Sequence, residues 1–151
     1  MLGLLETKIS GEVATKCCKS LGFDKWMRIE SVGFSGIIWL LWKSNWDIEV
    51  LSTHPQFAHV RVKQGNVRPW VMTVVYASPN QTLRNLLWRD LSVNELRIND
   101  PWMVVGDFNS VSSPEEVLND TSYSMRRSSK FMWILGTLGA NLHGVGDAVR
   151  R

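Results

Sequence analysis

The sequence contains few cysteines, and this scarcity excludes several classes of protein. Its 151 residues include only two cysteines, Cys17 and Cys18, which are neighbours in the chain. A disulfide between neighbouring residues is strained and rare, and adjacent cysteines do not form a Cys-x-x-Cys zinc motif. We therefore interpret both as free thiols in a reducing compartment, and we expect neither a disulfide framework nor a zinc knuckle.

Long apolar runs and leader-like segments are missing as well. No run approaches the roughly 20 apolar residues that span a bilayer. The stretch Met1–Leu5 has no basic residues before its apolar ones and turns polar at Glu6, so no signal peptide is visible. No repeat or linker divides the chain. We expect an intracellular protein with one domain at residues 1–144 and a poorly ordered tail at residues 145–151.

Neither sign of charge dominates. The chain has 17 Lys and Arg against 14 Asp and Glu, which gives a net charge of +3 and a pI near 9.1. This balance suits a polyanionic partner without requiring one. Three histidines are present. His54 and His59 flank Pro55 in a predicted loop, without the spacing of a metal site, and we assign no role to His143.

Apolar residues are plentiful and fall into short runs typical of β-strands. Hydrophobic residues make up 44% of the chain and include eight tryptophans. Composition and alternation predict strands at residues 2–5, 26–32, 37–42, 48–52, 57–62, 70–76 and 102–105. Gln64-Gly65-Asn66 is a hairpin signal between two of them. Strands with helices between some of them predict a layered α/β or α+β domain.

Three segments have the pattern of helices. The segment 11–21 follows Ser10, a candidate N-cap, and places Val13, Cys17 and Leu21 on one face, so that Cys17 is expected in the core. The segment 82–98 has an apolar stripe opposite a polar side that includes Arg84. That stripe consists of Leu83, Leu86, Leu87, Leu91 and Leu96. A third helix is predicted at residues 129–138.

The segment Val104 to Asn109 is the most informative for chemistry. A buried strand ends in glycine and is followed by Asp107-Phe108-Asn109, at the strand end where α/β sheets present active sites. The carboxylate can orient a water or bind a metal, and the carboxamide can donate to a phosphate oxygen. Asp and Asn are equally typical of an ordinary turn. For this segment alone the turn is the better interpretation.

Two more polar residues follow apolar strands. Glu6 can be a ligand for Mg²⁺, or simply a solvated carboxylate near the start of a helix. Tyr76 can hydrogen-bond a phosphate, or it can be a core tyrosine with its hydroxyl at the surface. If the strands before Glu6, Tyr76 and Asp107 are neighbours in one sheet, these groups converge as an active site requires.

Four motifs resemble those of one known family. They are Glu6-Thr7-Lys8, the run Val32 to Trp42, Val75-Tyr76-Ala77-Ser78-Pro79 and Gly106-Asp107-Phe108-Asn109. In order, spacing and residue type they resemble the endonuclease domain of plant LINE-type (non-LTR) retrotransposons, a branch of the endonuclease/exonuclease/phosphatase superfamily. The match is co-linear from about Leu2 to Gly144.

The resemblance implies a fold and a chemistry. The fold is a four-layer α/β/β/α sandwich of the DNase I-like type, and the activity is Mg²⁺- or Mn²⁺-dependent hydrolysis of DNA phosphodiesters in the nucleus. By motif position, Glu6 would bind the metal and Tyr76 would hydrogen-bond the scissile phosphate. Asp107 would orient and deprotonate the attacking water, and Asn109 would stabilise the transition state. The expected partner is the DNA backbone, not a membrane.

The resemblance also has gaps. A first-strand asparagine and a final Ser-Asp-His motif of the family have no counterpart, and Leu142 occupies the position of another aspartate. We therefore expect a domain truncated at both ends, with weak or no activity. An inert retroelement remnant, or a non-catalytic nucleic-acid-binding domain, is the alternative. The basic residues Arg126, Arg127 and Lys130 suit binding or an ordinary solvated face. Related phosphodiesterases act on phosphoinositides or sphingomyelin instead.

Overall fold

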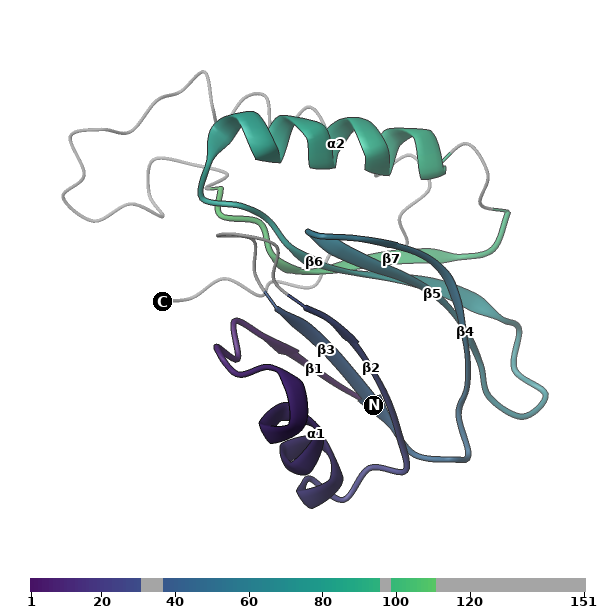
Figure 1. Ribbon diagram of the computed structural model, residues 1–151. Helices are drawn as coiled ribbons and strands as arrows, with labels where there is room; N and C mark the ends of the chain where they lie inside the picture. The colour runs from purple at the N-terminus through teal and green to yellow at the C-terminus, as the bar shows by residue number, and fades with distance from the viewer. Residues whose placement is uncertain (31–36, 96–98, 111–151) are drawn as a thin grey trace, which may run out of the picture.

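The computed structural model describes residues 1–30, 37–95 and 99–110 (Figure 1). In chain order the elements are β1 (Leu2–Leu5), α1 (Gly11–Ser20), β2 (Lys25–Ile29), β3 (Ile38–Trp42), β4 (Asp47–His54), β5 (Phe57–Lys63), β6 (Trp70–Tyr76), α2 (Gln81–Glu95) and β7 (Trp102–Asp107). No helix within these ranges is long and apolar enough to cross a membrane. The predicted helix at residues 129–138, the tail and the basic cluster lie outside the described residues.

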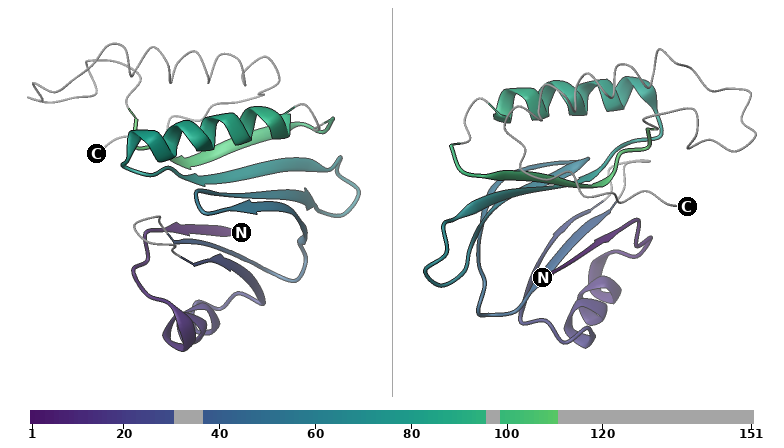
Figure 2. Two further views of the ribbon diagram at one scale, coloured as in Figure 1. Left: turned by 45° about the horizontal axis from the view of Figure 1, so that its top comes forward. Right: turned by 180° about the vertical axis from the view of Figure 1, so that it is seen from behind.

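The strands form two sheets that pack face to face. One sheet has the antiparallel order β1-β3-β2, and the other has the order β4-β5-β6-β7, in which only the pair β6 and β7 is parallel. Figure 1 shows α1 against the outer face of the first sheet and α2 over the outer face of the second. Figure 2 shows the same stack from two further directions. The predicted four-layer α/β/β/α order is confirmed for the described residues.

The space between the sheets is filled by apolar side chains. β3 is buried along its whole length, because its even-numbered residues face the other sheet and its odd-numbered residues face α1. Burying one such side chain stabilises the fold by about 1.5–3 kcal/mol. The inter-sheet core consists of Ile38, Leu40, Trp42, Ala58, Val60, Val62, Met72, Val74 and Tyr76. Tyr76 stands at the end of β6, so the core anchors its ring at the edge of the sheet.

The buried face of α1 differs from the predicted one. Val13 is 60% exposed, Cys17 is half-buried, and the fully buried residues are Ala14 and Cys18. The true apolar face is therefore one position later than the spacing of larger side chains indicated. Both buried positions carry small side chains that pack against Trp39 and Leu41 of β3. Ser10 is the N-cap residue, but its side chain makes no capping hydrogen bond.

The inner face of α2 also corrects the sequence interpretation. Leu87, Trp88 and Leu91 are buried against the sheet, whereas two residues of the predicted stripe, Leu83 and Leu86, are substantially exposed. Arg84, assigned to the polar side, is only 6% exposed. Its guanidinium Nη1 donates to the carbonyls of Ser78 and Pro79, and its Nη2 donates to the Gln81 side chain. These hydrogen bonds offset the cost of burying the charge.

His59 lies in β5, which confirms the strand predicted at residues 57–62 and corrects the loop assigned around Pro55. It is 3% exposed in β5, and its Nδ1 lies 2.6 Å from the hydroxyl of Thr73 on β6. The Trp102 indole donates to the same hydroxyl at 2.7 Å. Burial and the nearby Arg61 charge lower the pKa of His59 to about 4. His59 is therefore a neutral core residue that links three strands.

Candidate functional site

The three strand ends with polar groups meet across two sheets rather than in one. Glu6 follows β1, whereas Tyr76 and Asp107 end β6 and β7 in the other sheet. The idea that all three strands are neighbours in one sheet is therefore wrong for Glu6. Face-to-face packing joins the ends instead: Leu5 and Gly106 line one apolar cavity of about 280 Å³ between the sheets. The next residues in the chain, Glu6 and Asp107, therefore stand at one end of the sandwich.

The parallel pairing of β6 and β7 aligns two of the polar residues. Tyr76 is the register partner of Asp107, and Val75 is the partner of Gly106. Gly106 has a φ of +139°, and a Cβ at this position would lie 1.9 Å from the Val75 carbonyl oxygen. Glycine is therefore required where β7 approaches β6 just before Asp107. The Ala77 N–H donates to the Asp107 carbonyl at 2.7 Å and extends the pairing past both strands.

The Tyr76 phenol lies within the influence of both carboxylates. Its side chain belongs to the inter-sheet core and the residue is 7% exposed. Burial raises the pKa of Tyr76 above its usual value of 10, and the charges of Glu6 and Asp107 raise it further. The phenol therefore stays protonated at neutral pH and can donate a hydrogen bond.

The fourth predicted residue, Asn109, is held in a turn after β7. Its backbone N–H donates to the Asp107 carboxylate at 2.8 Å, and its side-chain Nδ2 donates to the Ala77 carbonyl at 2.7 Å. Its φ of +45° is in the left-handed region, which asparagine tolerates better than most residues. The segment therefore forms a turn, which is compatible with either interpretation of Asp107 and Asn109. The same turn holds the Asn109 amide next to Asp107.

Glu6 occupies a constrained but open position. Its backbone N–H donates to the Ile37 carbonyl at 3.0 Å, which continues the β1–β3 pairing by one residue. Glu6 and Lys8 both have φ values of +55°, so the chain turns sharply here. Their side chains form a loose ion pair at 3.8 Å, and both are largely exposed. The Glu6 carboxylate can therefore reach a ligand at the surface.

The donor set suits a hard divalent cation, but only loosely. The described part of the chain contains no group of three acidic, histidine or cysteine side chains that could enclose a metal ion. Mg²⁺ is commonly held by one or two carboxylates, with waters and substrate phosphates completing an octahedron. Glu6 supplies one exposed carboxylate, and Asp107 supplies a second at the same end of the sandwich. In chemical type these oxygens match the ligands that Mg²⁺ or Mn²⁺ prefers.

Comparison with solved structures places this arrangement among known folds. The chain is similar to the endonuclease domain of TRAS1, a telomere-specific non-LTR retrotransposon, with a TM-score of 0.57 and 16% identity. The match covers 76% of this chain and 52% of that chain, so the chain spans about half the length of its structural neighbour. The fold is DNase I-like. No protein-family model and no curated protein matches the sequence.

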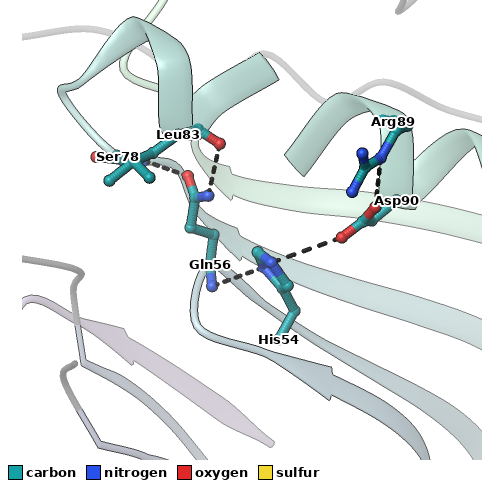
Figure 3. A network of polar contacts seen from close by, with 6 residues as sticks. All are labelled: His54, Gln56, Ser78, Leu83, Arg89 and Asp90. Atoms are coloured by element: carbon teal, nitrogen blue, oxygen red, sulfur yellow. Dashed lines mark hydrogen bonds and ion pairs between the residues drawn. The ribbon is translucent and has the colours of Figure 1, made fainter. Parts of the chain in front are cut away.

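The sequence gives no indication that Gln56 is buried next to the candidate site. Gln56 lies in the turn between β4 and β5, where a polar residue after proline is expected to be solvated, yet it is 3% exposed. Its side chain bridges Ser78, at the end of β6, to Leu83 of α2 (Figure 3). Only the tertiary structure reveals it, because its partners lie 22 and 27 residues away.

Proposed function

We propose that this chain is a phosphodiesterase of the nuclease type that acts on the DNA backbone with the help of Mg²⁺ or Mn²⁺. The observation that carries the proposal is the meeting of Glu6, Tyr76 and Asp107 at one end of the sandwich, where both carboxylates act on one buried phenol. The structural neighbour is the endonuclease domain of a retrotransposon, which agrees with this chemistry. The mildly basic chain suits a polyanionic substrate.

Each residue has a role that its position permits. A bound divalent cation would offset negative charge on the phosphate oxygens, and the Glu6 carboxylate would hold it. The Tyr76 phenol, which its raised pKa keeps protonated, would donate to a non-bridging phosphate oxygen. The Asp107 carboxylate would orient a water and accept its proton as the water oxygen attacks phosphorus. The deoxyribose oxygen opposite the attacking water would leave.

Asn109 would act beside Asp107. Its Nδ2 already donates to Ala77, so the amide plane is fixed before substrate arrives. A fixed amide needs no reorganisation when charge develops on phosphate, which is the condition for strong transition-state stabilisation. Asn109 would therefore direct its amide toward the charge that develops on phosphorus-bound oxygen.

The activity proposed is weak. With Glu6 as an exposed metal ligand, metal occupancy would depend on millimolar cation and on the substrate's own phosphates. The set of four residues supplies no histidine as a second proton acceptor or charge partner. Losing one general acid–base group typically costs about 10²–10⁴ in rate.

The proposal is tested by nicking of supercoiled plasmid DNA with Mg²⁺ or Mn²⁺. We expect slow nicking that EDTA abolishes, a loss of about 10²–10³ in Tyr76→Phe, and a loss of about 10²–10⁴ in Asp107→Asn. Glu12→Gln, an exposed carboxylate of α1, is the matched control and should leave the rate unchanged. Nicking that persists in Asp107→Asn would reject the proposal.

Two other outcomes lead to the alternatives. Salt-sensitive DNA binding without cleavage would identify a non-catalytic nucleic-acid-binding domain. Release of phosphate from a phosphoinositide, or of phosphocholine from sphingomyelin, without nicking of DNA would keep phosphoester hydrolysis as the reaction and change the substrate.

A further inference from the structure

Gln56 holds the segment from which the candidate site is built. Its backbone carbonyl accepts from the Tyr76 N–H at 2.9 Å, and its side-chain Oε1 accepts from the Ser78 N–H at 2.7 Å. These two hydrogen bonds lie on either side of Ala77. The Ala77 carbonyl in turn accepts from the Asn109 side chain at 2.7 Å. One buried glutamine therefore fixes the backbone that carries Tyr76 and that orients Asn109.

The orientation of the Gln56 amide is determined by its partners. The Ser78 N–H is a donor and requires the amide oxygen, whereas the Leu83 carbonyl is an acceptor and requires the amide nitrogen, which lies 2.9 Å away. Figure 3 shows this amide between the end of β6 and α2. The residue is 3% exposed, so water does not readily replace either hydrogen bond.

We infer that Gln56 is a positioning residue for the candidate site and sets the placement of the Tyr76 phenol and the Asn109 amide. This inference rests on the proposed function for its effect on catalysis. Its structural part stands separately, because it concerns the geometry of residues 76–78. The competing view is that Gln56 merely fastens the β4–β5 turn to α2. In that case its loss would lower stability and leave the site unchanged.

The pH dependence of a Gln56→Glu variant distinguishes a positioning role of Gln56 from a purely structural one. In Gln56→Glu, a protonated carboxyl can replace both amide hydrogen bonds: one oxygen accepts from Ser78 and the O–H donates to Leu83. The ionised carboxylate has no proton for Leu83 and places a lone pair against its carbonyl. Burial raises the pKa of such a carboxyl, and the buried Arg84 guanidinium, which donates to the Ser78 carbonyl, lowers it, so the carboxyl gains its proton as the pH falls through the acidic range. The variant should therefore recover as the pH falls.

The test compares wild type, Gln56→Glu and Gln56→Leu in metal-dependent nicking from pH 8 to pH 5.5. We expect Gln56→Leu to lower kcat by about 10- to 100-fold with little change in KM, because misplacement by about 1 Å has effects of this size. The rate of Gln56→Glu relative to wild type should rise several-fold as the pH falls. If Gln56→Leu does not fold, the rate of Gln56→Glu relative to wild type across this pH range is sufficient to test the positioning role.

Thr73→Val is the matched control. Thr73 is a buried polar residue on the same strand, and it accepts from Trp102 and contacts His59 without contacting the segment 76–78. Its replacement should lower stability, leave kcat near wild type and produce no relative gain at low pH. An equal loss of kcat in Thr73→Val would reduce Gln56 to a structural role and overturn the inference.

NMR supplies a readout that does not need activity. With labelled tyrosine and asparagine, the Tyr76 ring and the Asn109 side-chain amide should shift in Gln56→Leu and return toward wild type in Gln56→Glu at low pH. Absence of nicking in wild type would reject the proposed function while these shifts still support the positioning role. Unchanged Tyr76 and Asn109 signals in folded Gln56→Leu would overturn the inference, whatever the nicking result.

Discussion

At the residue scale, the Tyr76 phenol stands near two carboxylates, which lie at strand ends of different sheets. Tyr76 is buried in the inter-sheet core, with Glu6 and Asp107 as its charged neighbours. Each negative charge disfavours ionisation of the phenol. Removing either charge should therefore lower the pKa of Tyr76 toward its ordinary value.

A spectroscopic titration checks this prediction. The chain has two tyrosines, so a Tyr123→Phe background isolates the Tyr76 absorbance. We expect the pKa of Tyr76 to lie above 10 and to fall in Glu6→Gln, whereas Glu12→Gln leaves it unchanged. An equal pKa in Glu6→Gln and in the background protein would mean that Glu6 does not lie beside the phenol.

Gly106 provides a second prediction at this scale. A Cβ at this position would collide with the Val75 carbonyl, and φ is +139°. We expect Gly106→Ala to lower the free energy of unfolding by about 3 kcal/mol or more, through collision and backbone strain together. Gly65→Ala is the control: its φ is +54° but no atom lies near its Cβ, so it should cost about 1–2 kcal/mol. If urea denaturation shows that Gly106→Ala and Gly65→Ala lower the free energy of unfolding equally, the close approach of β7 to β6 at Gly106 is contradicted.

At the scale of elements, strands were predicted better than helix faces. β3 and β6 were predicted within one residue, because their continuous apolar runs are read directly from the sequence. The buried faces of α1 and α2 were not, because Ala14, Cys18 and Arg84 are placed by tertiary contacts rather than by hydrophobicity. The place of His59 near Pro55 predicts a loop, yet His59 lies within the strand expected at residues 57–62, and its burial depends on Thr73 and Trp102, which lie on other strands.

The His59 cluster makes the stability of the four-stranded sheet depend on pH. The pKa of His59 is lowered from 6.5 to about 4, so the unfolded chain binds a proton between these values that the folded chain does not. Stability is therefore fully present above pH 6.5 and falls as the pH drops toward 4, by about 3 kcal/mol in total. Burial lowers the pKa of His54 as well, which acts in the same direction.

Urea denaturation between pH 4 and pH 7.5 measures this contribution. His59→Gln retains an acceptor for the Thr73 hydroxyl and should remove most of the pH dependence in this window. His54→Gln should remove less, because His54 is less buried and faces Asp90. A pH dependence that is unchanged in His59→Gln would contradict the buried neutral histidine.

At the scale of the whole molecule, face-to-face packing of the two sheets brings Glu6 to the same end of the sandwich as Tyr76 and Asp107, which belong to the other sheet. The sequence places Glu6, Tyr76 and Asp107 at or just after the ends of apolar strands, and the structure confirms these positions. The sequence did not predict that Glu6 belongs to a separate sheet, because strand pairing between distant segments has no local signature. Gln56 is hidden for the same reason, since it is buried by segments 22 and 27 residues away.

Thermal unfolding with millimolar Mn²⁺ or Mg²⁺ tests the central claim most directly, because it asks whether Glu6 holds a cation next to the Asp107 carboxylate. A cation that binds only the folded chain must raise its Tm. We predict a metal-dependent rise in wild type that Glu6→Gln and Asp107→Asn each remove and that Glu12→Gln retains. A rise of equal size in all four proteins, or no rise in wild type, would contradict a shared metal site at the end of the sandwich.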